Sequence, residues 1–214
     1  MQERRIHVTG TGRAAKSPDW IELSLTLSAR NKDYAVAVQV AAQQIEMLRE
    51  SIVEAGFSAD DLKTTNFNVE AQYEREEFRE GSSKRFRENF VGFDCRHDLI
   101  LSFDFDDDKL SAALETISAC LSQPKISVAF TLKDTAALSD EILKSAAVDA
   151  QRKAKILCAA SGVKLGKLVE INYAPNDFQM MRTISAGASE DATFNFRPEE
   201  LTASDTAEFF WEID

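Results

Sequence analysis

The chain has 214 residues, of which 44% are hydrophobic and 29% charged, a composition typical of globular proteins rather than disordered ones. It contains 25 basic and 36 acidic residues, which gives a formal net charge of −11. Because such a surface repels phosphate groups, the composition argues against a nucleic-acid binder and disfavours binding to anionic membranes.

The N-terminal residues, from Met1 to Ile6, lead directly into a strand-like segment and lack the apolar stretch of a signal peptide. No later apolar run approaches the roughly 20 residues that span a bilayer, so no membrane span is predicted. The sequence as given predicts a cytoplasmic location. The periplasm or cell envelope is the alternative, if a signal has been removed.

Two strands are predicted at the start of the chain. Residues 4–9 form a short strand that ends at a turn containing Gly10 and Gly12. Residues 20–29 alternate, with Ile, Leu, Leu and Leu on one face and Glu, Ser, Thr and Ser on the other. A period of two with one polar face is typical of a half-buried antiparallel strand.

A long helix and a third strand follow. Apolar residues spaced by three and four from Tyr34 to Ala55 predict a helix, and Gly56 is placed to end it as the C′ residue. Residues 67–73 alternate again as a strand. The next segment, residues 74–89, consists almost entirely of charged residues and turn formers, so it is predicted to be an exposed loop or hairpin tip.

The second half of the chain shows the same two periodicities. The predicted elements are a strand from about 90 to 103, a helix opened by Asp106–Asp108, a strand over 126–132, a helix over roughly 138–161 that points Leu157 inward and ends at Gly162, and strands over 169–173 and 207–213. The fold class is therefore α+β, with about seven strands in antiparallel sheets, two long helices and one shorter helix. We expect a single domain over 1–214; two lobes, about 1–104 and 105–214, are the alternative.

Gly10-Thr11-Gly12-Arg13-Ala14-Ala15 fits the G-x-G-x-x-A pattern of dinucleotide-binding proteins. That pattern needs a helix next, whose N-terminus holds the pyrophosphate. Here Lys16-Ser17-Pro18-Asp19 and a strand follow instead, so a β-turn is favoured and no nucleotide cofactor is predicted.

Asp104 and the run Asp106–Asp108 suggest a Ca²⁺ or Mg²⁺ site. A calcium loop of the EF-hand type needs glycine at its sixth position and glutamate at its twelfth. Counted from Asp104, the sixth position holds Lys109 and the twelfth holds Glu115. Aspartates that cap a helix explain the run better, and no metal site is predicted.

The two histidines, His7 and His97, both lie in predicted strands. His97 shares a face with Cys95, but strand neighbours two residues apart are separated by about 6–7 Å, which is long for a nucleophile and its base. A packed histidine is favoured. The sequence contains no H-E-x-x-H, G-x-S-x-G or Walker motif, so no catalytic residues are predicted.

The three cysteines, Cys95, Cys120 and Cys158, are odd in number and form no C-x-x-C motif. Neither a disulfide framework nor a zinc site is indicated. Free buried thiols are predicted, and Cys120 and Cys158 are placed on helices beside the apolar stripes.

Several segments, taken in order, resemble the SIMPL domain family, a bacterial domain family of unknown function. They are IHVTGTG (6–12), SPD (17–19), AGFSADDLKTTNF (55–67), AAVDAQRKA (146–154) and ASGVKLG (160–166). The resemblance covers nearly the whole chain. It implies a compact α+β fold, oligomeric assembly, and for bacterial members an exported, envelope-associated location with a loose link to oxidative stress. It carries over no catalytic residues, and this chain departs from the pattern in lacking a signal peptide.

The leading hypothesis is a non-enzymatic, homo-oligomeric binding or assembly protein without cofactor or metal. A thiol-based oxidant sensor that uses one of the three cysteines is one alternative. An enzyme with an unrecognised site is the other. An exposed cysteine beside a basic residue would favour the sensor, and titratable groups gathered in one cleft would favour the enzyme.

Overall fold

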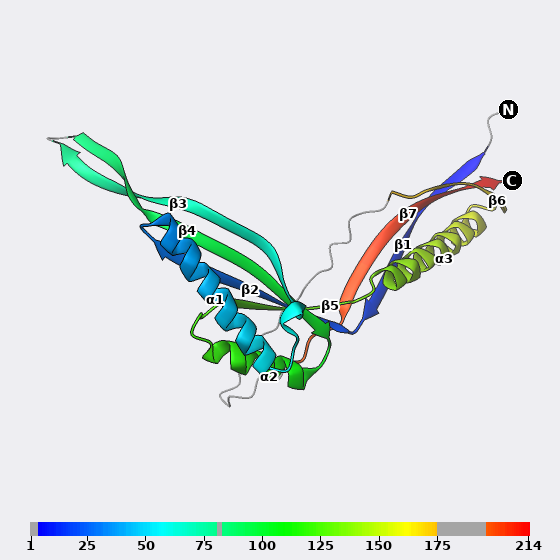
Figure 1. Cartoon of the computed structure of the whole chain (residues 1–214). Helices are drawn as coiled ribbons and strands as arrows, with labels where there is room; N and C mark the ends of the chain where they lie inside the picture. Colours follow the sequence, from blue (N-terminus) through cyan, green and yellow to red (C-terminus); the bar gives the residue numbers. More distant parts are fainter. Residues whose placement is uncertain (1–3, 81–82, 175–195) are drawn as a thin grey trace. The chain divides into compact units, whose positions relative to one another are not determined.

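The computed structural model describes residues 4–80, 83–174 and 196–214. Within them are three α-helices and seven strands, and the strands form two antiparallel sheets. This confirms the α+β class (Figure 1). Two of the helices are long and one is shorter, as predicted.

The chain divides into two compact units. The described residues of the first unit are 4–19, 131–174 and 197–214, and those of the second are 20–80, 83–130 and Phe196. The units are discontinuous in sequence, unlike the alternative of two lobes divided near residue 104. The reason is that a strand at the end of the chain, β7 (Leu201–Ile213), pairs with the first strand, β1 (Arg5–Lys16), so the first unit contains both ends of the chain.

The first unit is one helix on a three-stranded sheet. Helix α3 (Ala136–Ala160) packs on a sheet of order β1-β7-β6, in which β6 is Leu165–Asn172. The buried face of α3 repeats every four residues: Leu138, Ile142, Ala146, Ala150, Ala154 and Cys158. Leu157, predicted to point inward, is instead 49% exposed.

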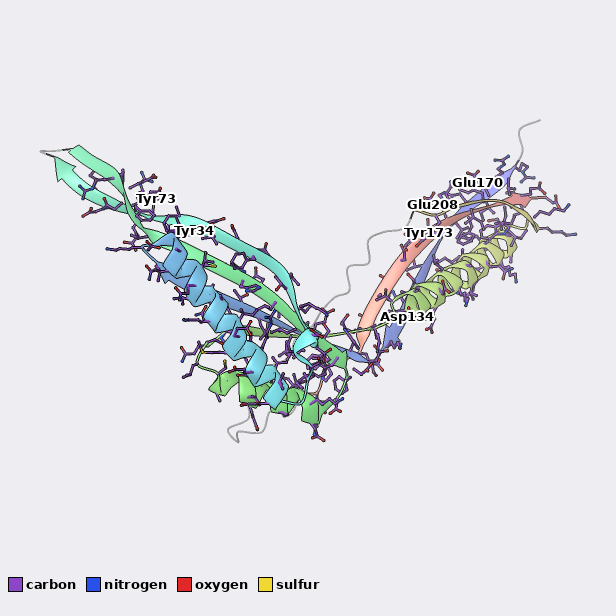
Figure 2. All side chains as sticks on the ribbon, viewed as in Figure 1. Tyr34, Tyr73, Asp134, Glu170, Tyr173 and Glu208 are labelled. Atoms are coloured by element: carbon purple, nitrogen blue, oxygen red, sulfur yellow. The ribbon has the colours of Figure 1, made fainter. Side chains whose placement is uncertain are left out.

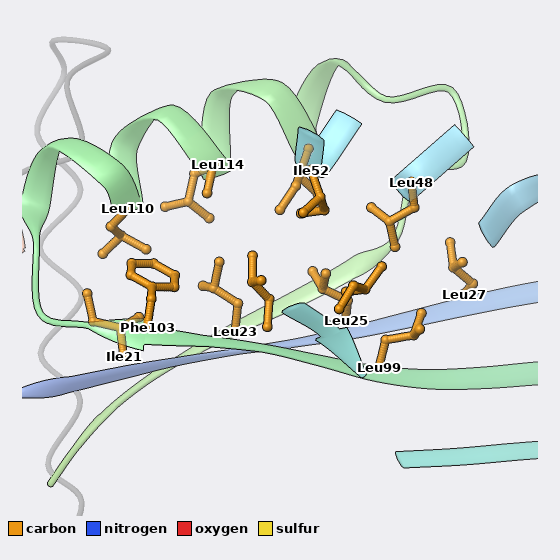
Figure 3. Close-up of a cluster of buried hydrophobic side chains, with 14 of the residues drawn as sticks. Ile21, Leu23, Leu25, Leu27, Leu48, Ile52, Leu99, Phe103, Leu110 and Leu114 are labelled. Carbon is orange, nitrogen blue, oxygen red and sulfur yellow. The ribbon is translucent and has the colours of Figure 1, made fainter. Parts of the chain in front are cut away.

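The second unit carries two helices on one face of a four-stranded sheet. Its elements are β2 (Trp20–Asn31), α1 (Tyr34–Glu54), the 3-10 helix η1 (Ala59–Asp61), β3 (Leu62–Glu80), β4 (Ser83–Asp104), α2 (Asp107–Ala119) and β5 (Lys125–Thr131), with sheet order β3-β4-β2-β5. The apolar half of the predicted alternation in β2 is buried against both helices (Figure 3). This core includes Ile21, Leu23 and Leu25 from β2, Leu99 and Phe103 from β4, Leu48 and Ile52 from α1, and Leu110 and Leu114 from α2.

Both long helices end in the same way. Gly56 and Gly162 have positive φ angles of 90° and 70°, the conformation that a C′ glycine supplies. The N–H of the next residue, Phe57 or Val163, donates to the carbonyl of the third-last helical residue, at 3.1 Å in each case. These are Schellman ends, which confirms the prediction of two C′ glycines.

Gly10 and Gly12 do not form the predicted turn, because β1 continues through both to Lys16. Both glycines face α3. A Cβ atom on Gly12 would overlap the carbonyl oxygen of Ile142, and one on Gly10 would overlap that of Ala146. The glycines therefore allow the helix backbone to lie directly against the strand. They were interpreted as a turn because glycine is common in turns and gives no sign, in one sequence, of a close helix.

Side chains from α3 close the outer edge of β1. The Thr11 N–H donates to the Asp149 carboxylate at 3.0 Å, and the Lys153 ammonium donates to the Thr9 carbonyl at 3.1 Å. Lys153 and Arg152 also pair with Asp149. Hydrogen bonds from Lys153, Thr11 and Arg152 hold the pKa of Asp149 well below its usual range. The edge of β1 thus has hydrogen-bond partners within the chain.

Residues 74–80 and 83–89, the hairpin arm, are strand rather than loop. They continue β3 and β4 beyond the start of α1 as a two-stranded ribbon, with Arg75 opposite Glu88 and Glu76 opposite Arg87 (Figure 1). Charged side chains suit this ribbon because both of its faces lie outside the core. Cross-strand pairing, which a single sequence does not display, distinguishes such a ribbon from a loop.

Candidate functional site

The face of the four-stranded sheet opposite the helices is polar. Alternate residues of β3 and β4 project from it and line an open cavity of about 510 Å³: Asn66, Asn68, Glu70, Gln72, Asp94, Arg96 and Asp98. The lining therefore has three carboxylates, three amides and one guanidinium. The strand period of two separates these side chains from the apolar core on the other face.

Asp98 is the centre of the hydrogen bonds on this face. Its carboxylate accepts from the Thr26 hydroxyl at 2.7 Å, from the Arg96 Nε at 3.0 Å, and from the Asn66 amide at 3.4 Å. The Thr26 hydroxyl contributes most to holding the pKa of Asp98 below its usual range. Burial, the next largest effect, raises this pKa, and the hydrogen bonds from Arg96 and Asn66 lower it further. Asp98 therefore stays ionised and fixes the guanidinium of Arg96 by its Nε.

The other two carboxylates oppose each other across the strands. Glu70 of β3 lies directly opposite Asp94 of β4. Glu70 accepts from the Asn68 amide at 2.6 Å, and Asp94 accepts from the Ser28 hydroxyl at 2.7 Å. Like charges placed directly opposite each other are destabilising, so these hydrogen bonds offset part of the repulsion.

The lining of the cavity offers both donors and acceptors of hydrogen bonds. No imidazole or thiol lies among the lining residues of the cavity. Within the described ranges, no group of three or more histidine, cysteine, aspartate or glutamate side chains is placed to hold a metal ion. The polar face can therefore donate to and accept from polar groups of a ligand or a protein.

The other face carries exposed aromatic rings at the base of the hairpin arm. Tyr34 at the start of α1 meets Phe93 edge-on at 5.4 Å, Phe93 meets Phe90 at 5.2 Å, and Phe90 meets Tyr73 at 5.7 Å. Tyr34 and Tyr73 are more than half exposed (Figure 2). Further along the arm, the guanidinium of Arg75 lies 3.8 Å from the ring centroid of Phe86. Exposed aromatic rings are enriched at protein interfaces.

A second open cavity, of about 470 Å³, lies in the first unit beside β6 and β7. Tyr173, Thr206 and Glu208 are among its lining residues (Figure 2). The Tyr173 hydroxyl donates at 2.9 Å to the carboxylate of buried Asp205, and this hydrogen bond raises the pKa of Tyr173. The pair ties the end of β6 to β7.

His97 and Cys95 do not form a catalytic pair. Cys95 is fully buried, and burial raises the pKa of its thiol. The Nε2 of His97 lies 2.8 Å from the Thr64 hydroxyl, and its ring meets Phe67 edge-on at 5.2 Å. Burial lowers the pKa of His97, so the neutral ring is favoured, as expected for a packed histidine.

His7, the other histidine, is on the outer face of β1. Its ring stacks on Phe210 at 4.3 Å, and its Nε2 lies 3.6 Å from Glu208. The aspartate run serves as a helix cap, as predicted: the Asp106 carboxylate accepts from the N–H groups of Asp108 and Lys109 at 3.1 and 3.0 Å.

All three cysteines are free and buried, which confirms the prediction of buried thiols. Cys120 lies at the C-cap of α2, just after the helix rather than within it. Burial alone would raise the pKa of Cys120, but hydrogen bonds from Ser122 and Ser51 outweigh it and lower the pKa. Its sulfur lies 3.0 Å from the Ser122 hydroxyl.

A thiol reagent in native buffer is expected to label all three cysteines slowly, because none is more than 7% exposed. Cys120 should react first, since its pKa is lowered. Labelling kinetics followed with and without denaturant test this, with Cys120→Ser as the matched control. Rapid labelling of all three thiols in the native protein would contradict it and would favour an oxidant sensor.

The polar face was missed in the sequence. The apolar residues of 67–73 were used to predict a strand, but the polar residues that alternate with them, Asn66, Asn68, Glu70 and Gln72, show the same period. These polar residues were the available signal. Its partners Asp94 and Asp98 come from β4 and could be assigned only once the strand register was known.

Among the described residues, no helix has both the length and the apolar character needed to cross a bilayer. Comparison with known proteins gives one family: the SIMPL family, described as "Protein of unknown function (DUF541)", whose model matches residues 6–211. No curated protein matches the chain. The matched range includes both units, the glycines of β1 and the alanine face of α3, and on this basis the chain belongs to the SIMPL family.

Proposed function

We propose that the protein is a non-enzymatic assembly protein that forms homo-oligomers, and that the hairpin arm is its main contact surface. The observation that carries the proposal is the ribbon formed by residues 74–80 and 83–89, over whose faces no helix of the described part of the chain lies (Figure 1). An isolated two-stranded hairpin is marginally stable in water. Contact with a further surface would stabilise it.

The charges of the arm favour a second copy as that surface. Residues 74–89 contain five acidic and five basic residues, whereas the whole chain has a net charge of −11. The arm therefore has no net charge, so two copies repel each other through most of their surface but not through their arms. Within the arm, Glu76 pairs with Arg87 at 2.9 Å and Glu77 with Lys84 at 2.8 Å. Exposed ion pairs of this kind contribute little to the stability of a monomer. Their partners can therefore be exchanged between the arms of two copies.

The aromatic row at the base of the arm supplies apolar area for the same contact. Tyr73 and Phe90 are 58% and 45% exposed. Tyrosine and phenylalanine are enriched at the centres of protein interfaces.

Replacing residues 74–89 by a short Gly-Ser turn is expected to lower the mass measured by light scattering from an oligomer to a smaller species. The core of the second unit should remain folded, because its buried residues lie outside the arm. Circular dichroism and thermal unfolding check the fold. Val148→Ser, which removes a 68% exposed apolar side chain from α3, is the matched control and should leave the mass unchanged.

A wild-type protein that is monomeric at all concentrations would overturn the proposal. An arm-shortened protein that unfolds would show that the arm is part of the core of the second unit.

A further inference from the structure

The outer edge of β3 is open. In the order β3-β4-β2-β5, β3 is the last strand on its side, and no strand within residues 4–80, 83–174 and 196–214 pairs with this edge. Such an edge presents main-chain N–H and C=O groups to any strand that approaches it. At the outer edge of β1, by contrast, Asp149 and Lys153 bond the Thr11 N–H and the Thr9 carbonyl.

Only a short window of β3 is regular and nearly uncharged. A shift in register between Thr64 and Asn66 places a bulge at Thr65. The arm, with its dense charge, begins at Glu74. Between them, residues 66–72 read Asn-Phe-Asn-Val-Glu-Ala-Gln, with polar and apolar side chains in strict alternation, one charge, and neither glycine nor proline. Bulges and charges normally protect edges from pairing, so the window between them is where pairing is allowed.

We infer that two copies of the chain pair antiparallel through residues 66–72 of β3, with Val69 opposite Val69 of the second copy. In this register Asn68 lies opposite Glu70, Phe67 opposite Ala71, and Asn66 opposite Gln72. An amide meets a carboxylate, a large ring meets a small side chain, and an amide meets an amide. Cross-strand pairs of these kinds stabilise a sheet.

The pairing of Asn68 with Glu70 occurs twice and closes a polar ring. Within one chain the Asn68 amide already donates to one Glu70 oxygen at 2.6 Å. The second oxygen of that carboxylate is then available to Asn68 of the second copy. Two amides and two carboxylates therefore alternate around the two-fold axis, on the polar face of the joined sheet.

Neighbouring registers are less favourable for definite reasons. Moving the two-fold axis to Glu70 places two glutamates directly opposite each other, which is destabilising. Moving it to Asn68 brings the Thr65 bulge opposite Ala71, where the strand is not regular. The two-fold axis is perpendicular to the sheet, so moving it by one residue still places polar side chains opposite polar ones and apolar side chains opposite apolar ones. The registers centred on Asn68 and Glu70 are therefore the relevant competitors.

This inference rests on the proposed homo-oligomer and adds a second contact, distinct from that of the hairpin arm, because in this register the arms of the two paired copies point in opposite directions. Asn68→Glu places a glutamate opposite Glu70 of the second copy, twice in each pair, and is expected to halve the mass measured by light scattering. The double variant Asn68→Glu with Glu70→Lys restores opposite charges and should restore the wild-type mass. Ser24→Glu adds the same charge to the same face, on β2 away from the edge, and should have no effect.

Cysteine cross-linking gives a second, independent readout of the register. A mixture of Asn68→Cys and Glu70→Cys chains should form interchain disulfides faster than either variant alone, because these positions are directly opposed.

The outcomes separate this inference from the proposed function. A monomeric wild-type protein overturns both. A wild-type oligomer that is unchanged by Asn68→Glu overturns the β3 contact alone. Cross-linking of Asn68→Cys chains with each other, faster than in the mixture, overturns the register.

Discussion

Deleting residues 205–214 is expected to unfold the first unit. These residues form most of β7, the central strand of the β1-β7-β6 sheet, so their loss leaves β1 and β6 without a common partner. Phe209 and Trp211 are each 6% exposed and stack at 5.6 Å. Burial of each large apolar side chain contributes about 1.5–3 kcal/mol. Domains of this size have a free energy of unfolding of only about 5–15 kcal/mol. Losing the burial of both side chains, together with the hydrogen bonds that β7 makes to β1 and β6, is therefore expected to exceed the stability of the unit.

The two tryptophans allow the units to be followed separately. Trp211 lies in the first unit and Trp20 in the second. In the truncated chain, Trp20 is the remaining tryptophan, and its fluorescence should still report a cooperative transition of the second unit, whose core is built from other residues. The far-ultraviolet signal of α3 should be reduced. Glu212→Ala, an exposed change in the same strand, is the matched control. A truncated protein that melts as one transition near the wild-type temperature would show that β7 is dispensable.

Gly12→Val is expected to destabilise the first unit by about 3 kcal/mol or more, at the upper end of overpacking changes. The added Cβ overlaps the Ile142 carbonyl oxygen and would lie 2.9 Å from the backbone nitrogen of Ala146. Both are backbone atoms of α3, so no side-chain rotation relieves the overlap and the helix must move away from β1. Equilibrium denaturation of the wild-type and variant proteins measures the loss in free energy of unfolding.

Thr9→Val in the same strand is the control for this experiment. Thr9 is on the exposed face of β1, and only its backbone carbonyl is used by Lys153. The same β-branched residue is therefore introduced into the same strand without approaching α3, and the free energy of unfolding should change little. Equal losses for the two variants would mean that the close approach of α3 to Gly12 is not important for stability.

Elements with clear periodicity were predicted from the sequence. The alternation in residues 20–29 lies within β2, and the three- and four-residue spacing from Tyr34 onward lies within α1, because both elements bury one face and expose the other. Gly56 and Gly162 were identified as helix ends because their role depends on local backbone conformation. Local causes of this kind are contained in a short stretch of sequence.

The features that were missed depend on contacts between distant segments. Gly10 and Gly12 are needed because α3 lies against them, and α3 begins more than a hundred residues later. Leu157 was placed inward because its residue type suits a core, but the close approach of α3 favours the smaller residues of the four-residue repeat, such as Ala154. The polar cavity joins β3 to β4, so only the register of the two strands brings Glu70 and Asp98 to one place.

The pairing of β1 with β7 also sets an order of events during synthesis. The second unit consists mainly of residues 20–130, so the ribosome completes its core residues while β7 is still untranslated. Domains fold as units during synthesis, the earlier ones first. Strand β1, although made first, must wait for almost the last residues, since Arg5 pairs with Glu212. During that interval the edge that pairs with β7 lacks its partner strand, whereas α3, which is translated before β7, supplies the groups that contact the apolar face and the outer edge of β1.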